Sequence, residues 1–121
     1  MKNKNTKGFT LIELLTVLAI IGIIVTFAVP QYAKFKAKAY DLKAQNDARN
    51  IALGEESYYM DNDEYLPCQN DGCTELPGVS AISKGVTVRA QVNLDSIQIQ
   101  TKHEKGSKEF VWDSARGGFV E

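Results

Sequence analysis

The chain has 121 residues, of which 44% are hydrophobic and 24% charged, and this length allows one modest domain plus an accessory segment. Its formal net charge is −1, and without Lys2, Lys4 and Lys7 the balance falls to −4. Binding to nucleic acid or to an anionic membrane surface draws on clustered Lys and Arg, and the only further cluster lies near residues 34 to 43. The composition therefore argues against a general surface for nucleic acid or anionic membranes, and no specific nucleic-acid partner is expected.

An apolar run with one ionisable side chain, that of Glu13, occupies residues 9 to 30 and reads FTLIELLTVLAIIGIIVTFAVP. As a helix this run would be roughly 33 Å long, enough to cross the hydrocarbon core of a bilayer. An ordinary secretory signal has a shorter apolar core that is followed by a small-residue cleavage site. Here the small residue, Gly8, lies before the run. We therefore expect a membrane-inserted stage.

Glu13 is the anomaly in this run, because a carboxylate in hydrocarbon is unfavourable by several kcal/mol unless it is paired, and such residues usually mark function. One interpretation is a membrane anchor that tolerates an acid near its end. The other requires a cationic partner. Cleavage after Gly8 would create one, since it leaves a positive amine on Phe9, four residues from Glu13.

The sequence of residues 8 to 32, GFTLIELLTVLAIIGIIVTFAVPQY, resembles the N-terminal signature of type IV pilins, which pseudopilins share. The resemblance implies an α+β pilin fold, in which a long N-terminal helix with a hydrophobic first half packs on a C-terminal antiparallel sheet of about four strands. It implies that residues 1 to 8 are a leader, which a prepilin peptidase removes between Gly8 and Phe9. The same enzyme would methylate Phe9, and Glu13 would neutralise the N-terminal amine of a neighbouring subunit.

The resemblance also implies partners and a location. The partners would be further copies of the chain in a helical filament, the prepilin peptidase and inner-membrane assembly machinery. The chain would reside in the inner membrane before assembly and then in an extracellular pilus of a bacterium. A major pilin would serve adhesion, twitching motility or DNA uptake, with no enzymatic activity and no cofactor.

The helical pattern continues beyond the membrane run, so that residues 31 to 60 are predicted to form an amphipathic half of the same helix. Its inner face is rich in alanine, and its members are Ala33, Ala37, Tyr40, Ala44, Ala48 and Ile51. The intervening polar positions, Asp41 and Asp47 among them, are assigned to a solvated outer face.

Gly22 and Pro30 are predicted to interrupt this helix, because proline removes the backbone donor that would bond the carbonyl of Thr26. A bend in the helix is one interpretation. The other is that residues 22 to 30 extend or unwind when subunits pack. The sequence leaves both open.

The segment from residue 61 to residue 85 contains turn-forming residues and is predicted to be an ordered connection between helix and sheet. It holds the two cysteines, Cys68 and Cys73, in the part of the chain that would leave the cytoplasm. A disulfide is therefore predicted, closing a small ring worth only about 2 kcal/mol. The spacing does not match a Cys-x-x-Cys redox or metal motif.

Residues 86 to 121 alternate apolar and polar side chains and are predicted to form an antiparallel meander. Turn-forming residues separate four expected strands, which are 86 to 93, 96 to 104, 108 to 113 and 118 to 121. One face of the sheet should pack onto the helix, with a set consisting of Ala90, Ile97, Ile99 and either Trp112 or Val111.

No catalytic constellation or metal site is predicted. The one histidine, His103, is interpreted as solvated or locally hydrogen-bonded, and the acids Asp61, Asp63 and Glu64 lack the loop spacing of an EF-hand. Two alternative functions remain open. A pseudopilin of a type II secretion system would share the chain's features up to Pro30, and a monomeric membrane-anchored binding domain would keep its leader and not need Glu13.

Overall fold

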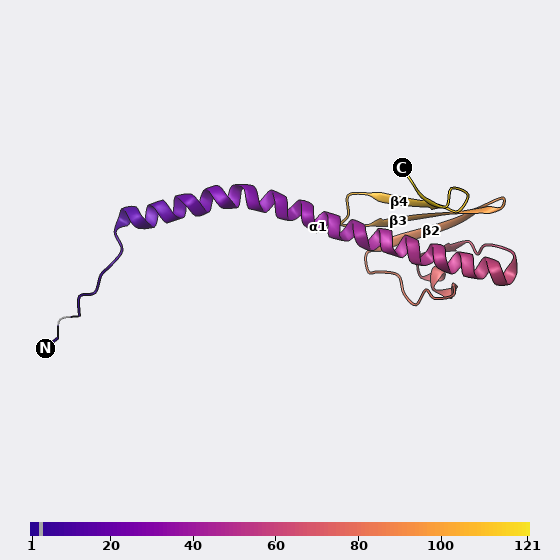
Figure 1. Ribbon diagram of the computed structural model, residues 1–121, viewed down its shortest axis with the longest axis horizontal. Coiled ribbons are helices and arrows are strands. Elements are labelled where there is room, and N and C mark those ends of the chain that lie inside the picture. Colours follow the sequence, from indigo (N-terminus) through magenta and orange to yellow (C-terminus); the bar gives the residue numbers. More distant parts are fainter. Residues whose placement is uncertain (3) are drawn as a thin grey trace. The chain divides into compact units, whose positions relative to one another are not determined.

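The computed structural model describes residues 1–2 and 4–121, whose contacts form two units, residues 1–35 and 36–121 (Figure 1). One helix, α1 (Leu11–Asn62, 52 residues), begins in the first unit and ends in the second. A single antiparallel sheet lies in the second unit. The α+β pilin fold expected from the sequence is confirmed.

In the first unit, α1 continues through both Gly22 and Pro30 as an α-helix. The Thr26 hydroxyl donates to the carbonyl oxygen of Gly22 at 2.8 Å, a bond across one helical turn just before the proline. Neither residue ends the helix here, and unwinding of residues 22 to 30 on packing stays a prediction. Every described side chain of this unit is exposed, and α1 is long and apolar enough to cross a membrane by length and composition.

The sheet of the second unit has five strands, one more than expected, in sequential antiparallel order. The four long predicted strands are confirmed to within one residue at each end, as β2 (Val86–Asn93), β3 (Ser96–His103), β4 (Glu109–Asp113) and β5 (Gly118–Val120). The strand missing from the prediction is β1 (Cys68–Gln69), which pairs with β2 inside the connection and is followed by the short helix η1 (Asn70–Glu75).

Small residues of α1 allow the sheet to approach closely, and Ala44, Ala48 and Ile51 are completely buried. Across the interface lie the inward-facing residues of the sheet, which include Ala90, Ile97 and Ile99 as predicted. Trp112 packs against this core at its edge and occupies the inner face, which settles the choice between it and Val111. Gly54 of α1 packs closely against the connection before β2, because an added Cβ would lie 3.0 Å from the carbonyl oxygen of Pro77.

Candidate processing and assembly site

Two reciprocal hydrogen bonds define the start of α1. The backbone N–H of Thr10 donates to Glu13 Oε2 at 2.9 Å, and the backbone N–H of Glu13 donates to Thr10 Oγ1 at 3.3 Å. This is a capping box, in which two otherwise unpaired helix N–H groups find acceptors. Glu13 also lies in the first helical turn, where the helix dipole favours a negative charge. This capping role of Glu13 was not among the predictions, although the Thr-x-x-Glu spacing is its known signature.

The capping box sets the helix boundary just after the predicted cleavage position. Gly8 and Phe9 precede the helix and are both exposed. No described atom lies within 4 Å of the Cβ that a larger residue would carry at position 8. Packing within the described chain therefore does not require glycine at this position. The peptide bond between Gly8 and Phe9 is accessible to an enzyme.

In the second unit, three carboxylates of α1 hold three separate loops. Asp41, Asp47 and Glu55 are 6%, 6% and 0% exposed, and each accepts hydrogen bonds from a different connection. The prediction that Asp41 and Asp47 lie on a solvated face was wrong. Periodicity placed them among polar neighbours, but loops from the sheet side cover them because each loop brings N–H or O–H donors that need an acceptor.

Asp41 fixes the turn between β3 and β4. It accepts hydrogen bonds from the Ser107 N–H at 2.7 Å, the Ser107 hydroxyl at 2.6 Å and the Lys108 N–H at 3.0 Å. Burial disfavours the charged form, but the hydrogen bonds from Ser107 and Lys108 outweigh it, so the pKa of Asp41 lies below its usual value of 3.8. Because the folded-state pKa is lowered, this carboxylate stabilises the fold above about pH 3.8, and the effect is lost as the pH falls through the folded-state pKa.

Replacing Asp41 with alanine should destabilise the second unit by about 3 kcal/mol, since three donors lose a charged acceptor. We expect a lower denaturant midpoint for the full chain in detergent, followed by circular dichroism at pH 7. Asp61→Ala is the matched control, because Asp61 is an exposed acid in the last turns of the same helix. Equal denaturant midpoints for the two variants would contradict the stabilising role assigned to the hydrogen bonds of Asp41.

Asp47 performs the same task for the connection before β2. Its two carboxylate oxygens accept from the N–H and the hydroxyl of Ser83, at 2.9 and 3.0 Å. Nearby, Thr101 donates its hydroxyl to the carbonyl oxygen of Ala44 at 2.8 Å, which links β3 directly to the helix backbone. Together these bonds fix the helix relative to the sheet within the second unit.

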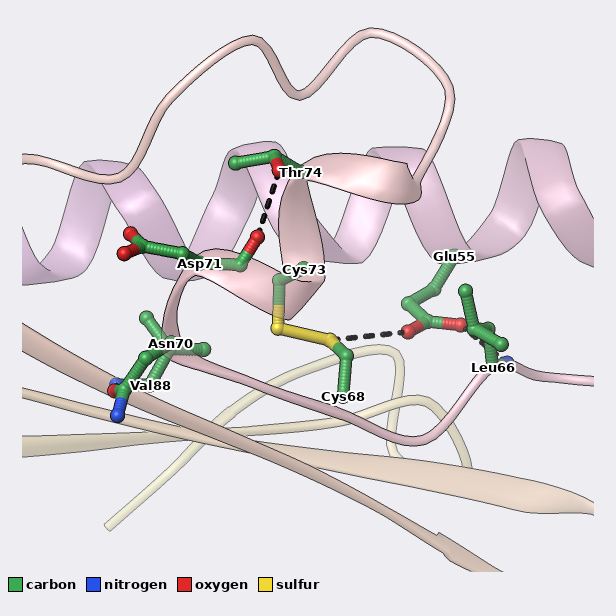
Figure 2. The surroundings of a disulfide bond; sticks show 8 residues. All are labelled: Glu55, Leu66, Cys68, Asn70, Asp71, Cys73, Thr74 and Val88. Carbon is green, nitrogen blue, oxygen red and sulfur yellow. Dashed lines mark hydrogen bonds between the residues drawn. A yellow bond between two sulfur atoms is a disulfide. The ribbon is translucent and has the colours of Figure 1, made fainter.

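Glu55 lies beneath the connection that carries the disulfide (Figure 2). The predicted bond between Cys68 and Cys73 is confirmed. Oε2 of Glu55 accepts from the Leu66 N–H at 2.9 Å, while Oε1 lies 4.0 Å from the Cys68 sulfur (Figure 2). Burial, with repulsion from Glu56 as a smaller cause, raises the pKa of Glu55 to about 7 against the opposing Leu66 hydrogen bond. The disulfide sulfur carries no proton, so a protonated Glu55 can itself donate toward it.

His103, the one histidine considered for chemistry, has a packing role, whereas Asp61, Asp63 and Glu64 are exposed. His103 is 2% exposed, stacks on Tyr40 with ring centroids 4.3 Å apart, and accepts the Lys105 N–H at Nδ1, which fits the locally hydrogen-bonded interpretation. Within residues 1–2 and 4–121, no group of three or more His, Cys, Asp or Glu side chains could hold a metal ion.

The chain is similar to one protein-family model and to several known proteins. A family model described as the prokaryotic N-terminal methylation motif matches residues 3–29. The type IV major pilin protein PilA of Myxococcus xanthus is 35% identical over 69 residues, covering 57% of this chain and 31% of that protein. A fimbrial protein of Neisseria meningitidis is 32% identical over 130 residues, covering 98% of this chain and 72% of its own length.

A further relative is named for a secretion system and not for a pilus. The type II secretion system core protein G of Escherichia coli is 36% identical over 70 residues, covering 58% of this chain and 48% of that protein. The match to the Myxococcus protein spans about a third of that relative's length, whereas the Neisseria match extends over nearly the whole of this chain.

Proposed function

The chain belongs to the type IV pilin family, and we propose that it is a major pilin, the structural subunit of a type IV pilus. The Neisseria match carries the family assignment, because it extends over 98% of this chain and includes the sheet. The observation that supports the polymer role is the first unit, an apolar helix whose described side chains are all exposed and which carries Glu13 near its start. Such a surface requires a membrane or other helices to cover it.

The proposed processing begins at the exposed residues before α1. A prepilin peptidase would remove residues 1 to 8 as a leader by cutting between Gly8 and Phe9, and would methylate Phe9. The helix boundary at Leu11 supports this, because it leaves the bond to be cut outside regular secondary structure. Cleavage supplies the positive amine that a carboxylate in a dry filament core needs.

Processing predicts a definite mass for the mature subunit. The protein isolated from its own cells should begin at Phe9 and carry one methyl group on its amine. A Gly8→Val variant should retain all eight leader residues, because the side chain would obstruct a site that reads glycine. Lys7→Gln is the control and should be cut normally. Intact-mass spectrometry distinguishes these outcomes, and a wild-type protein that begins at Met1 would contradict the processing.

We propose that residues 9 to 30 lie in the inner membrane before assembly and in the filament core afterwards. Residues 31 to 60, the connection and the sheet would then form the filament surface, with inner-membrane assembly machinery as a partner. The filament would be extracellular and serve adhesion, twitching motility or DNA uptake. Electron microscopy of cells that lack this protein tests the proposal, and surface filaments in normal number would contradict it.

A pseudopilin of a type II secretion system is the second candidate, favoured by the match to core protein G. The deletion strain separates the two candidates. Loss of filaments with normal protein secretion supports the major pilin. Loss of secretion with normal filaments supports the pseudopilin.

A further inference from the structure

We propose that the tip of the β2–β3 hairpin is a knob that inserts into a pocket between α1 and β4 of a second copy of this chain. The knob consists of Leu94 and Asp95. The pocket is lined by Arg49, Ala52, Leu53, Glu56 and Trp112. This inference rests on the proposed function, since it identifies a contact between neighbouring subunits of the filament outside the apolar helix.

Leu94 has an unfavourable position in the folded subunit. Asn93 pairs with Ser96, so Leu94 and Asp95 form a two-residue hairpin turn. Leu94 has a φ of +52°, a left-handed conformation that glycine, asparagine or aspartate adopts far more readily than leucine. Its side chain is 99% exposed and packs on nothing in its own subunit. A strained, exposed leucine therefore gains nothing within the fold, which points to a partner.

The pocket is suited to a branched apolar side chain. Its volume is about 230 Å³, and its walls, formed by Arg49, Ala52, Leu53, Glu56 and Trp112, are mainly apolar. Leu53 is 71% exposed, so one wall is open to an incoming group. Trp112 is held edge-on against Phe119, with ring centroids 5.2 Å apart, so the wall that Trp112 forms is fixed by packing.

The pairing of Asp95 with Arg49 is the reason to propose a second copy as the occupant. The guanidinium carbon of Arg49 lies 5.5 Å from the centroid of the Phe119 ring, which places a cation beside the pocket. In the knob, the acid Asp95 follows Leu94 directly and is exposed. The rim carries both Arg49 and the acid Glu56, so the knob matches the pocket when Asp95 lies on the Arg49 side, away from Glu56. Knob and pocket are different surfaces of one chain, so the contact joins copies head to tail, which can produce an open helical polymer.

The replacement Leu94→Gly tests the proposal by effects of opposite sign. Glycine removes the strain at φ +52°, so the denaturant midpoint of the full chain in detergent should rise. It also removes the knob, so filaments should dissociate about tenfold faster under mild heating. Leu94→Ala retains the strain and loses the knob, so the denaturant midpoint should stay close to the wild-type value while filaments dissociate faster. A Leu94→Gly chain that is more stable and forms filaments of wild-type persistence would overturn the proposal.

Charge exchange tests the identity of the partner. Asp95→Arg and Arg49→Asp should each weaken filaments, and the double variant should regain most of the loss. A photo-crosslinking residue at position 94 should join filament subunits through Leu53 or Trp112 of a second copy. Crosslinks to another protein, to lipid or to another region of the chain would overturn the proposal. If wild-type cells form no filaments, the proposed function is overturned together with this contact. A failure of the variants alone overturns only the contact.

Discussion

Replacing Glu13 with alanine should abolish filament formation while leader removal and folding of the second unit continue. In the proposed filament, the variant would leave the amine of a neighbouring Phe9 buried without a counter-charge. Breaking a buried pair from one side is unfavourable by about 3 to 5 kcal/mol, which corresponds to at least roughly a hundredfold loss at each contact. Filament yield measured by electron microscopy should fall to background, with the mature mass of the subunit unchanged apart from the substitution.

Two control variants separate the charge of Glu13 from its capping role. Glu13→Gln keeps an oxygen that can accept from the Thr10 N–H, so the helix should still begin at Leu11, yet filaments should be lost. Thr10→Val removes the hydroxyl that accepts from the Glu13 N–H but keeps the charge, so filaments should form. Normal filaments from Glu13→Gln would show that helix capping, and not charge, is what assembly requires.

The second large effect concerns pH and Glu55. Its folded-state pKa is raised from 4.5 to about 7, so the folded chain binds a proton more tightly than the unfolded chain. The stabilisation is fully present below about pH 4.5 and is lost as the pH rises through about 7. We expect a decline in unfolding free energy on the order of 2 kcal/mol across this range.

Glu55→Gln should remove most of this decline, because a neutral amide keeps an acceptor for the Leu66 N–H and carries no charge to bury. The variant should be more stable than the wild type at pH 8 and about equally stable at pH 4. Glu56→Gln is the control, and its pH profile should largely follow the wild type. Denaturant unfolding of the oxidised chain at several pH values provides the measurement. If Glu55→Gln loses as much unfolding free energy between pH 4 and pH 8 as the wild type, Glu55 is not the group responsible for the pH dependence.

Much of the fold was predictable because it depends on local patterns. The 3.6-residue period of the helix and the two-residue period of the strands each lasted long enough to be recognised, and Cys68 and Cys73 were the only cysteines available to pair. The two-residue strand β1 was not predictable, since it forms only by pairing with β2 and has no period of its own. Its neighbour Asn70 extends this pairing with a side-chain oxygen that accepts from the Val88 N–H at 3.0 Å.

The buried acids show where sequence periodicity fails. Asp41 and Asp47 have the local pattern of a solvated helix face, and only the folded chain brings donors from Ser107 and Ser83 to them. These partners are 66 and 36 residues away along the chain, so no local rule identifies them. Glu13 was recognised because it is an ionisable residue in an apolar run. The Thr-x-x-Glu spacing of its capping box is also present in the sequence, but the capping role was not predicted from it.

The most direct test of the assembly account is the position of the Glu13 carboxylate in an assembled filament at near-atomic resolution. In the subunit this carboxylate accepts from the Thr10 N–H of its own chain at 2.9 Å. We predict that in the filament it lies within about 4 Å of the methylated amine of Phe9 of a neighbouring copy. A filament in which no neighbouring amine approaches Glu13 would contradict the proposal that cleavage creates the charge on which assembly depends.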